Sequence, residues 1–208
     1  MSDYTDKPTI TMYTCQTKTV LDAINRDGIS YVKQIYIDQK YQETAWIFKE
    51  AYSFFVNYAS GLLEKPKQAQ SPVWLFHAPE WAKPEQGSMR LKVEVPKEEV
   101  LFFDMRKWNS ILNLNLIGTK DEEKEFEKEL EKWGLMHSSD IFLNSFYPML
   151  KSKVKNSWKK LFEDSQDIIR ELEENSYQKF GNKDTDYIQG AVWCLKKEWI
   201  REKYLKKI

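Results

Sequence analysis

The stretch from Met89 to Asn113 constrains the fold more than any other part of the chain. Apolar and polar residues alternate strictly from Met89 to Val95, which predicts a strand with one buried face and one face in solvent. Pro96 ends this strand, because proline cannot donate a hydrogen bond to a neighbouring strand. The continuous apolar run from Val100 to Phe103 predicts a second strand, adjacent to the first and buried on both faces.

A helix is expected directly after this second strand. Asp104 is a typical N-cap residue, and the apolar residues that follow it form one helical stripe, made of Trp108, Ile111 and Leu112. The two strands and the helix together indicate an α+β domain. We expect a single domain of this class over residues 1–208, since 41% of the residues are hydrophobic and can form a core.

The charge and cysteine content argues against several classes of protein. Lys plus Arg and Asp plus Glu both number 32, so no overall electrostatic field favours nucleic acid or an anionic membrane. Cys15 and Cys194 are too few for a disulfide scaffold or a zinc site. We therefore expect a reduced, cytoplasmic protein with no disulfide between them. No apolar stretch is long enough to span a bilayer, so no membrane partner is expected.

The N-terminal half contains four predicted elements and a loop. The alternation from Ile10 to Thr17 predicts a strand, and the short helix after it is expected to end at Gly28. Apolar residues repeat at intervals of three and four from Tyr41 to Ala59, which predicts a long helix. Residues 73–76 form an apolar strand, and the proline-bearing residues 77–88 are expected to form an ordered loop.

The C-terminal half is expected to begin with a mainly helical insertion, residues 118–182, packed against one side of the sheet. Residues 120–133 predict a highly charged helix, and Pro148 is expected to interrupt a later one. The charged helix has a narrow apolar stripe, made of Phe126, Leu130 and Trp133. Residues 184–194 predict a late strand, and residues 199–208 fit either a last strand or a short amphipathic helix.

Two groups of residues in the N-terminal half are candidates for ligand binding. Thr14 and Gln16 lie at the polar end of the first strand, where side chains are well placed to hold a ligand. The alternative is that they only satisfy local backbone groups. Tyr52 and Trp74, with Trp46, could form an aromatic wall for a planar ligand, although such residues more often belong to the core.

Two further candidates lie on the loop and on the late strand. Lys83 shares its loop with His77 and Trp81 and could meet a phosphate; the alternative is a solvated lysine. Gln189 precedes Gly190, so its amide could approach a ligand closely, or it could simply close a backbone hydrogen bond. The chain lacks a glycine-rich phosphate loop, a Gly-x-Ser-x-Gly elbow, a His-Glu-x-x-His motif and a Cys-x-x-Cys motif, which argues against kinases, hydrolases and zinc enzymes.

Several short pieces together span nearly the whole chain: Tyr13-Thr14-Cys15-Gln16, Ala51-Tyr52, Pro72-Val73-Trp74, Lys83-Pro84, Leu91 to Pro96, Asp104 with Trp108, and Gln189 with Trp193. Together these pieces resemble a small uncharacterised bacterial domain family. The order of the expected elements is also similar to the ADP-ribosyltransferase fold, a split antiparallel sheet that holds nicotinamide adenine dinucleotide (NAD) in its cleft. The helical insertion would be an addition to that fold.

This resemblance implies a role for each candidate residue. Thr14 and Gln16 would bind the nicotinamide ribose of NAD, Tyr52 and Trp74 would form a wall against its base, and Gln189 would be the catalytic residue, with Lys83 as a further NAD contact. Gln16, Tyr52 and Gln189 would then converge in one cleft. The first strand has no His or Arg, and Gln189 stands where such enzymes have an acid. A neutral amide gives less electrostatic stabilisation to a positively charged ribose.

The function implied by the resemblance is transfer of ADP-ribose from NAD, as substrate, to a nucleic acid or protein. Such an activity would fit phage defence or a toxin that is held inactive by an antitoxin or another inhibitor protein. The alternative is a non-catalytic binding module on the same scaffold. An exposed aromatic patch far from the cleft would favour this second hypothesis.

Overall fold

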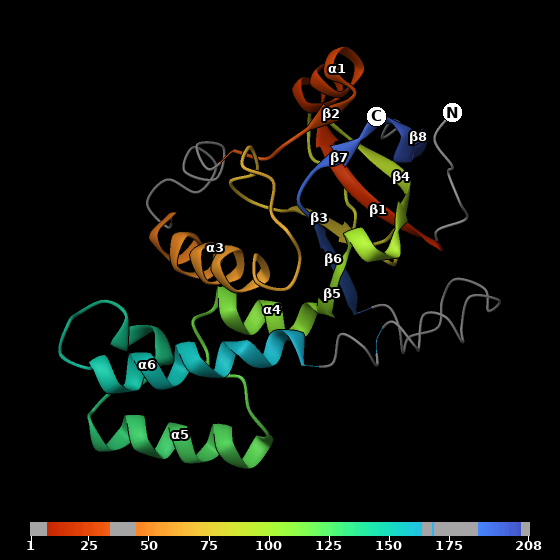
Figure 1. The fold of residues 1–208 in the computed structure, drawn as a ribbon. Coiled ribbons are helices and arrows are strands. Elements are labelled where there is room, and N and C mark those ends of the chain that lie inside the picture. Colours follow the sequence, from red (N-terminus) through yellow and green to blue (C-terminus); the bar gives the residue numbers. More distant parts are fainter. Residues whose placement is uncertain (1–7, 34–44, 164–167, 169–186, 205–208) are drawn as a thin grey trace.

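The computed structural model describes residues 8–33, 45–163, 168 and 187–204. A six-stranded antiparallel sheet forms its centre, with the strand order β5-β6-β3-β1-β4-β8 (Figure 1). A second antiparallel pair consists of β2 (Ile29–Ser30) and β7 (Leu195–Lys196). The strands of the large sheet are β1 (Thr9–Thr17), β3 (Val73–Phe76), β4 (Ser88–Pro96), β5 (Leu101–Asp104), β6 (Ile188–Val192) and β8 (Ile200–Tyr204).

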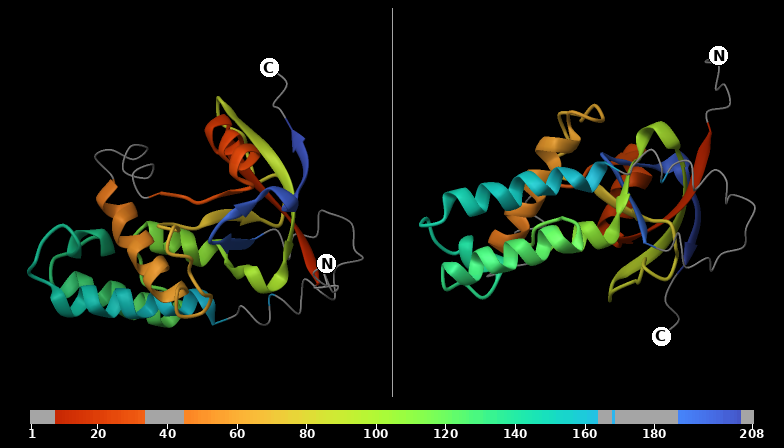
Figure 2. Two further views of the ribbon diagram at one scale, coloured as in Figure 1. Left: turned by 45° about the horizontal axis from the view of Figure 1, so that its top comes forward. Right: turned by 90° about the horizontal axis from the view of Figure 1, so that it is seen from below.

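The helices lie at two ends of the molecule. The α5–α6 arm extends farthest from the sheet, with α3 and α4 between it and the strands, whereas α1 lies near β2 and β7 (Figures 1 and 2). The α-helices are α1 (Lys18–Asp27), α3 (Ala45–Ala59), α4 (Met105–Leu112), α5 (Lys120–Lys132) and α6 (Pro148–Ser157). Short 3₁₀ helices also lie between these elements in the described part of the chain: η2 (Lys97–Glu99), η3 (Ser138–Ile141), η4 (Trp158–Phe162) and η5 (Lys197–Trp199).

The two faces of the large sheet pack against different helices. The α1 face is covered by Leu21 and Ile24 of α1, which belong to one core with the aliphatic side chains of β1, β3 and β4. The α3 face is covered by α3, α4 and η4, whose aromatic side chains form a second core around Phe55. Alternation along each strand sends successive side chains to these two cores, so the sheet is buried on both sides over much of its area.

The α+β class predicted from the sequence is confirmed, and so are the strand and helix that follow Pro96. The side chain of Asp104 caps α4 by accepting a hydrogen bond from the backbone N–H of Arg106 at 2.7 Å. Gly28 ends α1 with φ 76°, a left-handed conformation that favours glycine. The last segment is also settled, because β8 makes residues 200–204 a strand rather than a helix.

The predicted adjacency of the two strands around Pro96 is wrong. β4 and β5 are both strands, but β1, β3 and β6 lie between them and β5 pairs with β6. The apolar pattern explains this placement, because a strand that is apolar on both faces needs a core on each side. Phe102 belongs to the core of the α1 face and Phe103 to that of the α3 face.

Two details of the helical arm also differ from the sequence-based expectation. Trp133 follows α5 but is largely exposed, whereas Phe126 and Leu130 are buried as expected. Pro148 does not interrupt a helix but begins α6, because the first turn of a helix does not need the N–H that proline lacks. The expected elements at residues 41–44, 164–167, 169–186 and 205–208 lie outside the described residues. No helix among the described residues is long and apolar enough to cross a membrane.

Candidate functional site

A single row of side chains crosses all six strands on the α3 face. Directly paired residues of neighbouring strands point to the same face of a sheet, so the strand register defines this row. We call it the central row; in strand order it consists of Phe103, Gln189, Phe76, Tyr13, Lys92 and Glu202. The row begins with an aromatic ring on β5, has the amide of Gln189 and the phenol of Tyr13 on either side of Phe76, and ends with a charged residue on each of β4 and β8.

Gln189 is the most unusual member of the central row. Its side chain is only 3% exposed, and its Oε1 atom has no hydrogen-bond partner among the described residues. A buried polar atom left unpaired costs about 1–3 kcal/mol, so proteins rarely keep one without a reason. Gly190 beside it serves packing: an added Cβ would lie 2.8 Å from Cγ1 of Val100 and 3.0 Å from Cε of Met12.

Tyr13 places a phenol in the same row, one strand beyond Phe76. Its side chain is buried, and this burial raises the pKa of the phenol, although the neighbouring Lys92 partly offsets the effect. The phenol is therefore neutral near pH 7 and can donate a hydrogen bond. Lys92 in turn pairs with Glu202 at 2.9 Å, which balances the charge at this end of the row.

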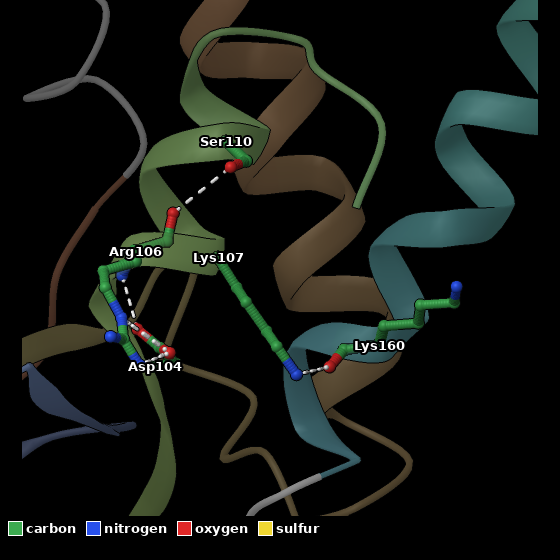
Figure 3. A network of polar contacts seen from close by, with 5 residues as sticks. All are labelled: Asp104, Arg106, Lys107, Ser110 and Lys160. Atoms are coloured by element: carbon green, nitrogen blue, oxygen red, sulfur yellow. Dashed lines mark hydrogen bonds and ion pairs between the residues drawn. The ribbon is translucent and has the colours of Figure 1, made fainter. Parts of the chain in front are cut away.

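An arginine lies close to the start of β6. The guanidinium of Arg106 forms an ion pair with Asp104 at 2.6 Å, and its carbon lies 4.1 Å from the ring centre of Tyr187, two residues before Gln189. Figure 3 shows this pair at the start of α4, with Ser110 donating a hydrogen bond to the backbone carbonyl of Arg106. The buried carboxylate and the ring hold the guanidinium in one orientation, while most of the Arg106 side chain stays exposed. Such a cation is suited to binding an anionic group.

The loop over the charged end of the row is tied to the sheet. Arg90 of β4 donates a hydrogen bond through Nη1 to the carbonyl of Pro79 at 3.1 Å, and its guanidinium lies 5.1 Å from the ring centre of Tyr204. Lys83, on the same loop, is exposed, with Nζ 6.0 Å from the ring centre of Trp81. Residues 77–87 thus form the ordered loop that the sequence predicts.

The predicted first-strand residues lie on the opposite side of the sheet. Thr14 pairs with Leu91 and is buried in the α1 face, and Gln16 donates a hydrogen bond from Nε2 to Oγ1 of Thr14 at 2.8 Å. Because side chains alternate along β1, these two residues point away from Gln189. The structure therefore does not bring Gln16 together with Tyr52 and Gln189.

Tyr52 and Trp74 do lie on the α3 face, where they belong to the aromatic core. The indole N–H of Trp74 donates a hydrogen bond to the hydroxyl of Tyr52 at 2.9 Å, so each polar group has a partner. The ring of Trp74 also lies 4.9 Å from that of Phe55 and 4.9 Å from that of Trp108, measured between centroids. The pair forms a rigid wall behind the central row.

Sequence reasoning missed Tyr13 as a site residue. The alternation from Ile10 to Thr17 could have identified Tyr13, because it separates Tyr13 from its neighbour Thr14. Among the described residues, no group of three or more His, Cys, Asp or Glu side chains is placed to hold a metal ion.

Fold and site together define an α+β domain whose sheet has one aromatic and polar face. The chain belongs to a family described as a domain of unknown function, DUF3841, whose model matches residues 11–201. This confirms the expectation of an uncharacterised domain family. No curated protein and no solved structure matches the chain. The function must therefore be argued from the chemistry of the site.

Proposed function

We propose that the chain is an ADP-ribosyltransferase-like domain that binds NAD on its α3 face, around Gln189. The observation that carries this proposal is the buried Oε1 of Gln189, which has no hydrogen-bond partner among the described residues. The carboxamide of nicotinamide has two N–H donors and could supply the missing hydrogen bond. The resemblance of the sequence to the ADP-ribosyltransferase fold is the reason for proposing NAD rather than another ligand that carries an amide.

The neighbours of Gln189 match the other parts of NAD. Phe76 offers an aromatic ring for the nicotinamide, and the neutral phenol of Tyr13 can donate to a ribose hydroxyl. Lys83 could supply a cation for the pyrophosphate from the loop, whereas Arg106 is held by Asp104, which pairs with Ile188 on the α1 face. Tyr52 and Trp74 would support the bound NAD as the aromatic wall behind the central row. Thr14 and Gln16 would not contact it, because they lie on the α1 face.

The reaction proposed for this site is transfer of ADP-ribose. The bond between the nicotinamide nitrogen and ribose C1 breaks, nicotinamide leaves, and a nucleophile of a nucleic acid or protein forms a new bond to C1. Gln189 would orient NAD but could not neutralise the positive charge that develops on the ribose, so we expect slow turnover. A slow, damaging transferase would suit phage defence or a toxin controlled by an inhibitor protein.

NAD titration by calorimetry tests the site with a matched pair of variants. Gln189→Ala should weaken NAD binding by about tenfold, the effect of losing one hydrogen bond to a buried amide. Gln16→Ala removes the same side chain from the α1 face and should leave the affinity unchanged. Absence of NAD binding by the wild type, or equal weakening by both substitutions, would contradict the proposal.

The second candidate function is a non-catalytic binding module on the same scaffold. It is supported by a group of exposed apolar side chains on the α5–α6 arm, which lies apart from the central row. Release of nicotinamide from NAD, measured with nucleic acid and protein acceptors, separates the two functions. NAD binding without any nicotinamide release would favour the module.

A further inference from the structure

The end of the α5–α6 arm displays a group of large apolar side chains. We call it the tip patch; it consists of Trp133, Met136, Leu143, Phe146 and Met149, which are 60% to 83% exposed. They fall in one short segment, at the end of the arm that is remote from the sheet (Figure 1). Other large apolar side chains that are exposed, such as Leu62 and Trp81, lie elsewhere in the chain. Scattered side chains of this kind are normal, whereas a contiguous group marks an interaction surface.

The backbone that bears the tip patch is held by its own hydrogen bonds. The side chain of Asp140 accepts from the backbone N–H of Met136 at 3.2 Å and from that of His137 at 2.9 Å. Oδ1 of Asn144 accepts from the N–H of Phe146 at 2.9 Å. The patch is therefore formed before any partner arrives, and a partner need not order it.

The segment that bears the tip patch also contributes buried side chains to the core of the α3 face. Ile141, Phe142 and Leu150 are buried, and the ring of Phe142 stacks on that of Trp158 with centroids 5.9 Å apart. The ring of Tyr147, which is only partly exposed, contacts Trp133 at 5.9 Å and joins the two ends of the loop. The five residues of the tip patch are thus additional to those that stabilise the arm, so their apolar surface has no use within the described fold.

We propose that the tip patch is the contact of a homodimer, in which a second copy of this chain docks its own tip patch about a two-fold axis. The area agrees with this partner: five large side chains, mostly exposed, offer an area of the order of the roughly 800 Å² that each partner buries in a standard interface. In a two-fold dimer each patch must complement itself, and an apolar centre does so.

The charges around the tip patch also favour a second copy. Residues 131–151 contain two acids, Glu131 and Asp140, and two lysines, Lys132 and Lys151, and the whole chain has a formal net charge of zero. Two copies therefore do not repel each other, and near-zero net charge favours association. An anionic membrane or a strongly charged partner would instead be met by an excess of one sign.

Sedimentation velocity over a wide range of protein concentration tests the dimer. The wild type should sediment as a dimer, and Phe146→Asp should weaken dimerisation by at least about 30-fold, the effect of losing an interface hot spot. Leu62→Asp is the matched control, because it adds the same charge to an exposed leucine outside the patch and should leave the dimer intact. Circular dichroism should be the same for all three proteins, since both replaced side chains lie in solvent.

Three outcomes would overturn the inference. The first is a wild type that stays monomeric at every concentration. The second is a dimer that Phe146→Asp and Met149→Asp leave unchanged, which would place the interface elsewhere. The third is a monomer that sediments with vesicles of neutral phospholipid, which would assign the patch to a lipid surface. None of these outcomes depends on whether the chain binds NAD, so the dimer and the proposed function can fail separately.

Discussion

The two faces of the six-stranded sheet are packed by different kinds of side chain. The core of the α1 face is mainly aliphatic, and its buried Thr14 has Gln16 as a hydrogen-bond partner. The core of the α3 face is rich in aromatic rings, and its buried Gln189 keeps an acceptor without a partner among the described residues. Both faces bury a polar group, but Thr14 has a partner and Oε1 of Gln189 has none among the described residues. The comparison teaches that burial of a polar residue alone does not locate a site, and that an unpaired buried atom is the better candidate where other polar side chains lie beside it.

Removal of a ring from the α3 face should have the largest effect on stability. Phe55 is fully buried and contacts Trp74, Trp108 and several other rings, so Phe55→Ala should lower the free energy of unfolding by about 4 kcal/mol. Denaturant unfolding followed by circular dichroism measures this change. Leu62→Ala, at an exposed position outside the tip patch, should cost close to nothing. Similar losses in both variants would contradict the packing described for the α3 face.

The tight packing of the α1 face can be tested at Gly190. A methyl group there would lie within 3.0 Å of two side chains, so Gly190→Ala should lower the free energy of unfolding by about 2 kcal/mol. Gly61→Ala is the control, because its nearest new contact would be the carbonyl of Tyr58 at 3.4 Å. Both variants can be unfolded in urea under the same conditions. Unchanged stability of Gly190→Ala would mean that Val100 and Met12 approach β6 less closely than described.

Replacement of Gln189 by an apolar residue of similar size separates a contribution to NAD binding from a contribution to the stability of the fold. Gln189→Leu removes the unsatisfied acceptor, so the protein should keep its stability or gain up to about 1 kcal/mol. NAD affinity should fall in the same variant by tenfold or more if the proposed site is correct. Unfolding and titration should be measured on one preparation. A large loss of stability would show instead that the amide is a structural group.

The smallest expected effect concerns the two cysteines, whose rates of alkylation measure how well each face of the sheet is buried. Cys194 is buried in the core of the α1 face, and this burial raises the pKa of its thiol to about 11. At pH 8 only about one thousandth of such a thiol is the reactive thiolate, so alkylation of Cys194 should be slow. Cys15 is half-buried on the other face, and burial raises the pKa of its thiol as well.

Mass spectrometry of protein labelled for increasing times should therefore find the first label on Cys15. Faster labelling of Cys194 would contradict its burial. The same measurement on protein kept without reductant tests for a disulfide. We predict no loss of two hydrogens, because Cys15 and Cys194 belong to different faces of the sheet.

The sequence predicts the individual strands and helices of this fold better than it predicts which strands pair with each other. Alternation between Met89 and Val95 is a local property and gave β4 correctly, whereas the position of β5 depends on which strands find a core on both faces. The same limit applies to Trp133, which continues the apolar pattern of α5 but lies beyond the surface that α6 covers.

The site was predictable only in part, because it too depends on which strands pair. Gln189 was a candidate because it precedes a glycine in an apolar strand, but the space beside Gly190 is filled by side chains rather than by a ligand. Thr14 and Gln16 were chosen for their place at a strand end. Which face each residue joins follows from the pairing of β1 with β3, and that pairing is not a local property of the sequence.

Among the described residues, β8 is the outermost strand at one edge of the sheet, and this edge affects the solubility of the protein. An edge strand offers unpaired backbone groups to other chains and can seed aggregation. Arg201, Glu202 and Lys203 place charges along β8, and a register shift between Lys92 and Val93 makes its pairing with β4 irregular. Charges and irregular pairing both discourage another strand from adding to the edge. A chain without net charge gains little protection from overall repulsion, so this local protection of its edge matters more.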